Sequence, residues 1–365
     1  MHFTARSHKQ AVASGVLLAA LLALAIGASS APGQAPSLTN PGFECTQGFA
    51  PQEGISGLVP AGWTAALLSG NPKLNSTRIE FAGSCEGSGF IERLEGDDSL
   101  VILAEEIETP PEPGKPFDVV ITQQVTVTQG VAYSLSGWQV SFCGGSATPN
   151  DCPEGYYITK MAGLDPVGGL DPAAASVVWA EDRRNFTESR WANLRLGATA
   201  QGMTLTIFAR VASPFQWHGA HAIVDAFSLV EAPTAHFVDL PPAAGGMTVT
   251  VRWDGALSLD IVAIPGGNYH LRFDIQTRPA GQPDWTDWLV DQPAGEATFT
   301  AAFCIPMQAH EFRVRARAEQ PEGVPGAFPN HRYPGDWSAP AVVMFERETP
   351  CPPHAYLPLM VNAWP

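Results

Sequence analysis

Alternating apolar and polar positions recur along this chain, and the clearest case is the stretch from Met203 to Glu231. Apolar residues occupy every second position from 203 to 211, with threonine and arginine among the residues between them. This period of two is typical of a half-buried β-strand. A second strand is expected to follow it. One face of that strand is expected to carry His221, Ile223, Asp225, Phe227 and Leu229.

Asp225 stands out because large apolar residues surround it on the same expected face. A bare carboxylate in such a place is costly, so it needs a compensating partner. That partner is either a set of hydrogen-bond donors or a bound cation, and the pattern leaves both open.

The same alternation predicts further strands along the chain. They cover 119–127, 133–142, 177–180, 191–196, 247–253, 269–276 and 312–318, and 79–90 contains another. Two segments, 105–115 and the turn-dense 162–172, are expected to be loops. No segment sustains a helical period, and 35 glycines with 33 prolines favour short strands joined by turns. The expected fold class is all-β.

The length of 365 residues favours two domains, with a boundary at Ala232–Pro233. At the N-terminus, Arg6 and Lys9 precede an apolar run and then small residues, which is the order of a secretory signal peptide. An uncleaved anchor is the alternative, although the run is short for a bilayer. The expected division is a signal peptide at 1–31, a first domain at 38–231, a second domain at 236–347 and a C-terminal tail at 348–365.

The signal peptide and the net charge limit the classes of partner that this protein can have. A chain exported by such a signal peptide is expected to be secreted or held at the cell surface, and we expect no membrane span in the mature protein. The net charge of −16 argues against nucleic acid as a partner. Six cysteines in an exported chain favour structural disulfides over a redox or metal site. The expected pairs are Cys45–Cys85, Cys143–Cys152 and Cys304–Cys351.

Motifs at both ends of the first domain resemble a galactose-binding-like jelly roll of the carbohydrate-binding-module kind. The motifs are 40–44 (Asn-Pro-Gly-Phe-Glu), 60–63 (Pro-Ala-Gly-Trp) and 223–229. The resemblance implies a jelly-roll β-sandwich, a carbohydrate ligand and a structural calcium beside Glu44 and Asp225. The family often has two successive acids at the last strand, and here the second is Ala226. The alternative for Asp225 is a carboxylate satisfied by backbone N–H groups.

The second domain resembles a fibronectin type III domain of an exported bacterial protein. The motifs are 249–253, 285–288, 311–316 and 335–338. The resemblance implies an immunoglobulin-like β-sandwich that serves as a spacer or contacts another surface protein. The tyrosine that usually precedes Phe312 by two residues is replaced by His310.

Carbohydrate binding in such modules relies on aromatic faces that stack on pyranose rings. The candidate ligand-binding residues are Tyr156, Tyr157, Trp179 and Trp217, with Trp138 a weaker candidate. Core packing is the alternative for each of them, and it is the expectation for Trp63.

Several other polar residues have a structural explanation as well as a functional one. Asp165 and Asp171 fit either a second cation site or Asx turns. His218 and His221 have a zinc-like spacing but are expected on opposite faces of a strand. Adjacent acids such as 97–98 are not a glycosidase signature, because glycoside hydrolysis needs two acids that face each other across a cleft.

The sequence therefore predicts a non-catalytic extracellular or cell-surface protein that binds carbohydrate through its first domain. One alternative is a structural or adhesive envelope protein that contacts other proteins. Another is a protein associated with glycoside hydrolysis.

Overall fold

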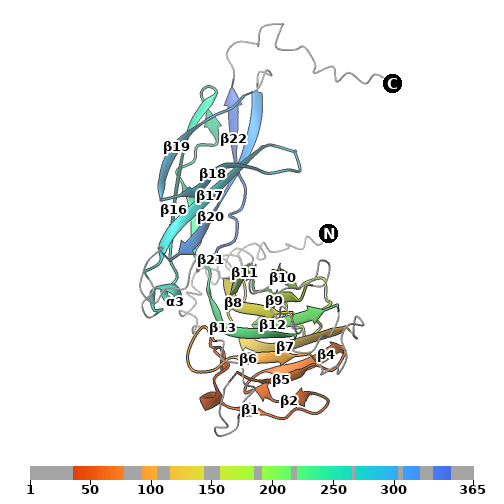
Figure 1. Ribbon diagram of the computed structural model, residues 1–365. Helices are drawn as coiled ribbons and strands as arrows, with labels where there is room; N and C mark the ends of the chain where they lie inside the picture. The colour runs from red at the N-terminus through yellow and green to blue at the C-terminus, as the bar shows by residue number, and fades with distance from the viewer. Residues whose placement is uncertain are drawn as a thin grey trace, which may run out of the picture. The chain divides into compact units, whose positions relative to one another are not determined.

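The structure is a computed structural model (Figure 1), which describes residues 36–77, 85, 93–104, 116–143, 157–184, 191–214, 220–264, 268–302, 307–320 and 332–346. These residues belong to one compact unit, Ala35–Pro365. Nearly all of the described elements are β-strands. The helical elements among them are the 3-10 turn η1 (Cys45–Gln47) and the short helix α3 (Leu259–Val262). The all-β prediction is confirmed. No helix within the described ranges has the length and apolar character needed to cross a membrane.

Two large sheets, whose strands lie between Ser56 and Glu231, pack face to face. The five-stranded sheet has the order β10-β9-β12-β7-β4 and the six-stranded sheet the order β11-β8-β13-β6-β5-β2. The first consists of β4 (Thr64–Ser69), β7 (Phe117–Thr126), β9 (Thr159–Asp165), β10 (Val178–Asp182) and β12 (Thr204–Ser213). The second consists of β2 (Ser56–Gly57), β5 (Lys73–Ser76), β6 (Leu100–Leu103), β8 (Ala132–Phe142), β11 (Ala192–Thr199) and β13 (His221–Glu231). Two short strands, β1 (Phe49–Ala50) and β3 (Val59–Pro60), pair separately.

The core between these sheets follows the alternation of the sequence. Val119 and Ile121 of β7 and Ile207 of β12 meet Leu135 of β8 in one apolar cluster. Trp63 lies in the same cluster, so the expectation that it is a core residue is confirmed. In β7 the intervening residues, among them Asp118, Thr122 and Gln124, therefore lie on the face turned away from the core.

The strand β13 departs from its expected alternation. Its register against β8 shifts between Asp225 and Ser228, and Ala226 adopts a left-handed φ of 50°. This bulge changes the phase of the side chains. Phe227 lies in the main core, whereas Ile223 packs in a separate apolar cluster with residues of β6 and β8. The prediction that His221, Ile223, Asp225, Phe227 and Leu229 share one face is therefore wrong.

The strand β9 ends inside a segment that is expected to be a loop. Residues 162–165 pair with β12 on one side and mostly with β10 on the other. Ala162 and Leu164 are fully buried in the core. The prediction of a loop across 162–172 is wrong for its first four residues, because pairing on both sides outweighs their turn-forming composition.

The chain beyond β13 forms two further sheets around a second core. The three-stranded sheet has the order β14-β16-β19, and the larger sheet has the order β15-β22-β20-β17-β18, with β21 paired to β20. The strands are β14 (Thr234–Val238), β15 (Ala243–Ala244), β16 (Thr248–Ala256), β17 (His270–Pro279), β18 (Thr286–Gln292), β19 (Gly295–Thr300), β20 (Met307–Glu319), β21 (Arg332–Pro334) and β22 (Ala341–Glu346). Val251, Phe273 and Phe312 are fully buried in this core. The fibronectin type III identity and the domain boundaries stay predictions.

Several sequence predictions fall on residues outside the described ranges. They include the signal peptide, the strand at 79–90 except Cys85, the loop at 105–115 and the C-terminal tail. The disulfide Cys45–Cys85 is confirmed. Cys143 is disulfide-bonded, and its predicted partner Cys152 lies outside the described residues, as do Cys304 and Cys351.

Candidate functional site

A pocket of about 410 Å³ lies at one end of the five-stranded sheet, on the face turned away from the core. Its base is a row of cross-strand neighbours, in which Ala212 of β12 pairs with Asp118 of β7 and Thr159 of β9. These residues point outward because their chain neighbours point into the core. Tyr157 and Arg183 also line the pocket. The volume is within the range of small-molecule sites, about 300–1,000 Å³.

The carboxylate of Asp118 is held in place by an arginine on the adjacent strand. Arg210 donates from Nε to Oδ1 at 2.9 Å and from Nη2 to Oδ2 at 2.5 Å. This two-point hydrogen bond raises the pKa of the Arg210 guanidinium above its ordinary value. Asp118 therefore meets a ligand as a fixed hydrogen-bond acceptor whose charge is already paired.

Trp179 lies further along the same outer face. It pairs across the strands with Gly163, which in turn pairs with Phe208 of β12. A Cβ on Gly163 would lie 2.6 Å from the indole, so the ring occupies the space that glycine leaves open. The Arg210 guanidinium lies 5.9 Å from the Trp179 ring centroid. Arg210 thus contacts the pocket residue Asp118 on one side and Trp179 on the other.

Two of the four predicted ligand-binding aromatics, Tyr157 and Trp179, belong to this outer face, while Tyr156 and Trp217 lie outside the described residues. Trp138 is buried in β8 of the other sheet, with 4% of its surface exposed, which favours core packing.

Sequence reasoning missed Asp118 and Arg210. Arg210 is at an outward position of a predicted strand and Asp118 directly precedes another, but only cross-strand register shows that they pair.

Asp225 occupies a different place, at the bulge of β13, and is fully buried. Its Oδ2 accepts hydrogen bonds from Leu94 N at 2.8 Å, Glu95 N at 3.1 Å and Ser99 Oγ at 2.8 Å. Its Oδ1 accepts from Ala226 N at 2.7 Å. Burial raises the pKa of Asp225 to about 7, against the lowering effect of these hydrogen bonds.

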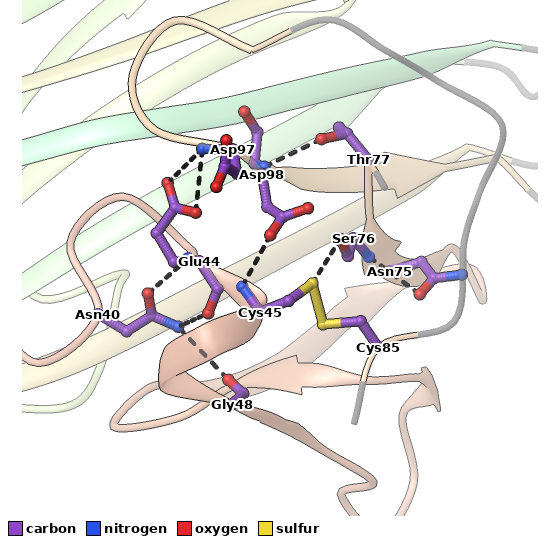
Figure 2. Close-up of a disulfide and its surroundings, with 11 residues drawn as sticks. Asn40, Glu44, Cys45, Gly48, Asn75, Ser76, Thr77, Cys85, Asp97 and Asp98 are labelled. Atoms are coloured by element: carbon purple, nitrogen blue, oxygen red, sulfur yellow. Dashed lines mark hydrogen bonds between the residues drawn. A yellow bond between two sulfur atoms is a disulfide. The ribbon is translucent and has the colours of Figure 1, made fainter. Parts of the chain in front are cut away.

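Glu44 and Asp98 hold the same loop from the N-terminal side (Figure 2). Both Glu44 carboxylate oxygens accept from Asp97 N, at 3.2 and 3.1 Å, and Asp98 Oδ2 accepts from Cys45 N at 3.2 Å. Burial, together with the charges of Asp98 and Asp97, raises the pKa of Glu44. The disulfide to Cys85 fixes the adjacent turn. The segment 40–45 is thereby attached to the 94–99 loop.

The first segment also lies directly beside the last strand, because Phe227 N donates to Pro41 O at 2.9 Å. A Cβ placed on Gly42 would lie 3.5 Å from Glu44 Oε1 and 4.0 Å from Asp225 Oδ1, so the two carboxylates converge. The groups facing Asp225 are N–H and O–H donors, which satisfy the carboxylate without a cation. Within the described ranges, no three or more acidic, histidine or cysteine residues form a group that could hold a metal. The contacts therefore favour the hydrogen-bonded alternative, and calcium stays a prediction.

For the remaining polar residues that the structure describes, the contacts support a structural role. Asp165 accepts from Val167 N at 3.1 Å and Gly169 N at 2.8 Å, and Asp171 accepts from Ala173 N at 2.9 Å. These are Asx turns, as one of the two alternatives predicted. His221 stacks on Phe142 with ring centroids 4.5 Å apart. His218 lies outside the described residues.

Comparisons with known proteins give only distant likenesses. No family model matches the chain, and no curated protein matches it. The chain is similar to the structure of TmCBM61 in complex with β-1,4-galactotriose, at 15% identity and a TM-score of 0.33, over 53% of this chain and 97% of that one. It is similar to a family 16 carbohydrate binding module at 15% identity and a TM-score of 0.23, over 38% of this chain and 80% of that one. It is also similar to the adhesin domain of Epf from Streptococcus pyogenes, at 7% identity and a TM-score of 0.24, over 70% of this chain and 78% of that one. Likenesses this distant do not identify a ligand.

Proposed function

We propose that this chain is an exported, non-catalytic protein that binds carbohydrate on the outer face of its five-stranded sheet. The observation that carries the proposal is the continuity of that face. Tyr157 in the pocket and Trp179 further along are joined by the Asp118–Arg210 pair, which contacts both the pocket and the indole. The second pair of sheets, formed by strands after β13, serves as a spacer or protein-interaction module.

The chemistry of this face suits a sugar. Aromatic rings provide flat apolar surfaces for the C–H faces of a pyranose, and fixed polar groups read its hydroxyls. Asp118 keeps lone pairs that can accept from sugar hydroxyls after Arg210 has bound its oxygens. Arg183 supplies donors at the pocket wall, and Thr159 adds a hydroxyl.

The charge arrangement in the pocket supports a binding role without catalysis. Asp118 is the acidic member among the described residues that line the pocket. Glycoside hydrolysis uses two carboxyl groups on opposite sides of the scissile bond, one of them able to donate a proton. A single carboxylate that is held at both oxygens by Arg210 is poorly suited to either catalytic role.

A glycan array probed with the full chain tests this function, followed by calorimetry with the strongest hit. We expect Trp179→Ala and Tyr157→Ala to weaken binding by roughly 10- to 100-fold, the effect of losing a buried aromatic contact of about 1.5–3 kcal/mol. Trp191→Ala is the matched control, because Trp191 is a half-buried tryptophan that packs on the six-stranded sheet instead. Thermal unfolding shows whether each variant is folded.

Two outcomes would reject the proposal. A folded chain that binds no glycan on the array would favour the alternative of a structural or adhesive envelope protein. Binding that is lost in Trp191→Ala but kept in Trp179→Ala would assign the ligand to the other sheet.

A further inference from the structure

Arginine and tryptophan side chains alternate in a stack on the larger sheet of the second half of the chain. The Arg278 Cζ lies 4.3 Å from the Trp285 ring centroid, and the Arg313 Cζ lies 4.3 Å from the same centroid. Arg313 is also 4.5 Å from the Trp337 centroid, and Arg315 is 4.7 Å from it. All four distances are within the range of cation–π contact. We call the stack Arg278–Trp285–Arg313–Trp337–Arg315 the Arg/Trp ladder.

The ladder lies on the side of β20 that faces away from the core. Phe312, Val314 and Ala316 of β20 are fully buried, so Arg313 and Arg315 between them point to the opposite side. All five ladder residues are half-buried. The stack is therefore part of the protein surface rather than of the core.

The charges along the ladder are unequally compensated. Arg278 Nε donates to Glu311 Oε2 at 2.5 Å, and Arg315 pairs with Asp274 Oδ2 at 2.9 Å. The central Arg313 instead donates from Nε and Nη2 to the neutral Gln276 Oε1, at 2.8 and 2.6 Å. In the part of the chain that the structure describes, Arg313 forms no salt bridge.

Two neighbouring arginines also make the surroundings of Arg313 electropositive. Burial and the nearby guanidinium groups of Arg278 and Arg315 lower its pKa, while the carboxylate of Asp287 acts in the opposite direction. Asp287 itself accepts a hydrogen bond from Gln276 Nε2 at 2.7 Å. A ligand anion at Arg313 would therefore relieve the repulsion among three cations.

The geometry of stacking decides which edges face a ligand. Two guanidinium groups over one indole must lie on its opposite faces, so both faces of Trp285 and of Trp337 are covered. What remains accessible is the rim of each ring, which is the positive part of its quadrupole, and the N–H edges of the arginines. A guanidinium recurs at every second step of the stack. Arg313 is thus the ladder arginine left for an anionic group, and the N–H edges of Arg278 and Arg315 flank it.

We propose that the Arg/Trp ladder binds an acidic polysaccharide, with a carboxylate or sulfate group of the ligand seated on Arg313. This site is separate from the proposed carbohydrate site on the five-stranded sheet. The net charge of −16 does not prevent such binding, since at about 0.15 M salt charges further away than roughly 8 Å are largely screened.

Binding of the full chain to polygalacturonate, dextran sulfate and neutral dextran tests the proposal and separates carboxylate from sulfate as the recognised group. We expect one or both polyanions to bind, with an affinity that falls as salt rises, and neutral dextran not to bind. Gln276→Glu places a carboxylate against Arg313 with little change in shape, and Arg313→Gln removes the cation. We expect each variant to weaken polyanion binding by at least about tenfold.

Arg252→Gln is the matched control. Arg252 is an exposed arginine of β16, on the three-stranded sheet, and its loss changes the net charge by the same amount as either test variant. It should change affinity less than about twofold. A folded wild-type chain that binds neither polyanion overturns the proposal, and so does an equal loss in Arg252→Gln. If Arg313→Gln fails to fold, Gln276→Glu still decides. Trp179→Ala should leave polyanion binding intact, which separates this site from the proposed function.

Discussion

The substitution Asp225→Asn removes a buried charge and leaves the side chain almost unchanged in size. In the structure the carboxylate accepts four hydrogen bonds, three at Oδ2 and one at Oδ1. Burial nevertheless outweighs these bonds and raises its pKa to about 7, from an ordinary value of 3.8. A group whose pKa is higher in the folded state binds its proton more tightly there. The contribution of Asp225 to stability is therefore fully present below pH 3.8 and declines as the pH rises through 7.

The size of the effect follows from the two pKa values. A tenfold change in proton affinity is worth about 1.4 kcal/mol, so the difference corresponds to a free energy on the order of 4 kcal/mol. An asparagine does not titrate. We expect the stability of the wild type relative to Asp225→Asn to fall by up to this amount between pH 4 and pH 8. Glu44 and Glu231 also have raised pKa values, but both remain in the variant and cancel in the comparison.

Urea unfolding of both proteins at intervals between pH 4 and pH 8 provides the measurement. A stability difference that stays constant across this range would refute the reasoning, because it would mean that the folded carboxylate titrates as it does in water. Repeating the series with calcium and with a chelator tests the calcium prediction. Calcium that stabilises the wild type near neutral pH and leaves Asp225→Asn unchanged would support that prediction, and no difference would count against it.

Three further changes probe the outer face, the disulfide and the core. Gly163→Ala places a Cβ 2.6 Å from the Trp179 ring, so we expect the indole to be displaced, its fluorescence to shift to the red, and glycan affinity to fall by about tenfold or more. Replacing Cys45 and Cys85 by alanine opens a loop with a sequence separation of 40 and should cost about 4 kcal/mol in urea unfolding. Phe227→Ala should cost about 3–5 kcal/mol, measured by thermal unfolding, because the ring packs in the core against two other aromatic rings.

Each of these changes has its own control. Gly202→Ala adds a Cβ with no atom within 4 Å and should change neither fluorescence nor affinity. If Gly163→Ala behaves like it, Trp179 does not depend on the glycine. The alanine pair at 45 and 85 isolates one disulfide, whereas a reductant would also open the bond of Cys143. Phe227→Leu keeps most of the volume and should cost much less than Phe227→Ala, and equal costs would contradict the packing argument.

Most strand positions follow from the sequence because burial of one strand face imposes a period of two on the residues. That pattern alone locates β7, β12, β16 and β20. The resemblance carried by the motifs at 40–44 and 223–229 also implied that Glu44 and Asp225 lie near each other, and the hydrogen bond from Phe227 N to Pro41 O shows why they do. Local pattern was sufficient for the strands because each strand belongs to one segment. The nearness of Glu44 and Asp225 followed instead from the resemblance to a galactose-binding-like jelly roll.

Tertiary structure decided the features that depend on two segments at once. Asp118 and Arg210 are 92 residues apart, and only the register of β7 against β12 makes them a pair. The bulge at Asp225 likewise arises where β13 meets β8, and it places Phe227 on the opposite face from Ile223, which the alternation had put on the same face. The periodicity of a strand can be read from its own residues, because their side chains alternate between buried and exposed positions. The partner of a side chain cannot be read in this way, because it depends on how another strand is aligned beside it.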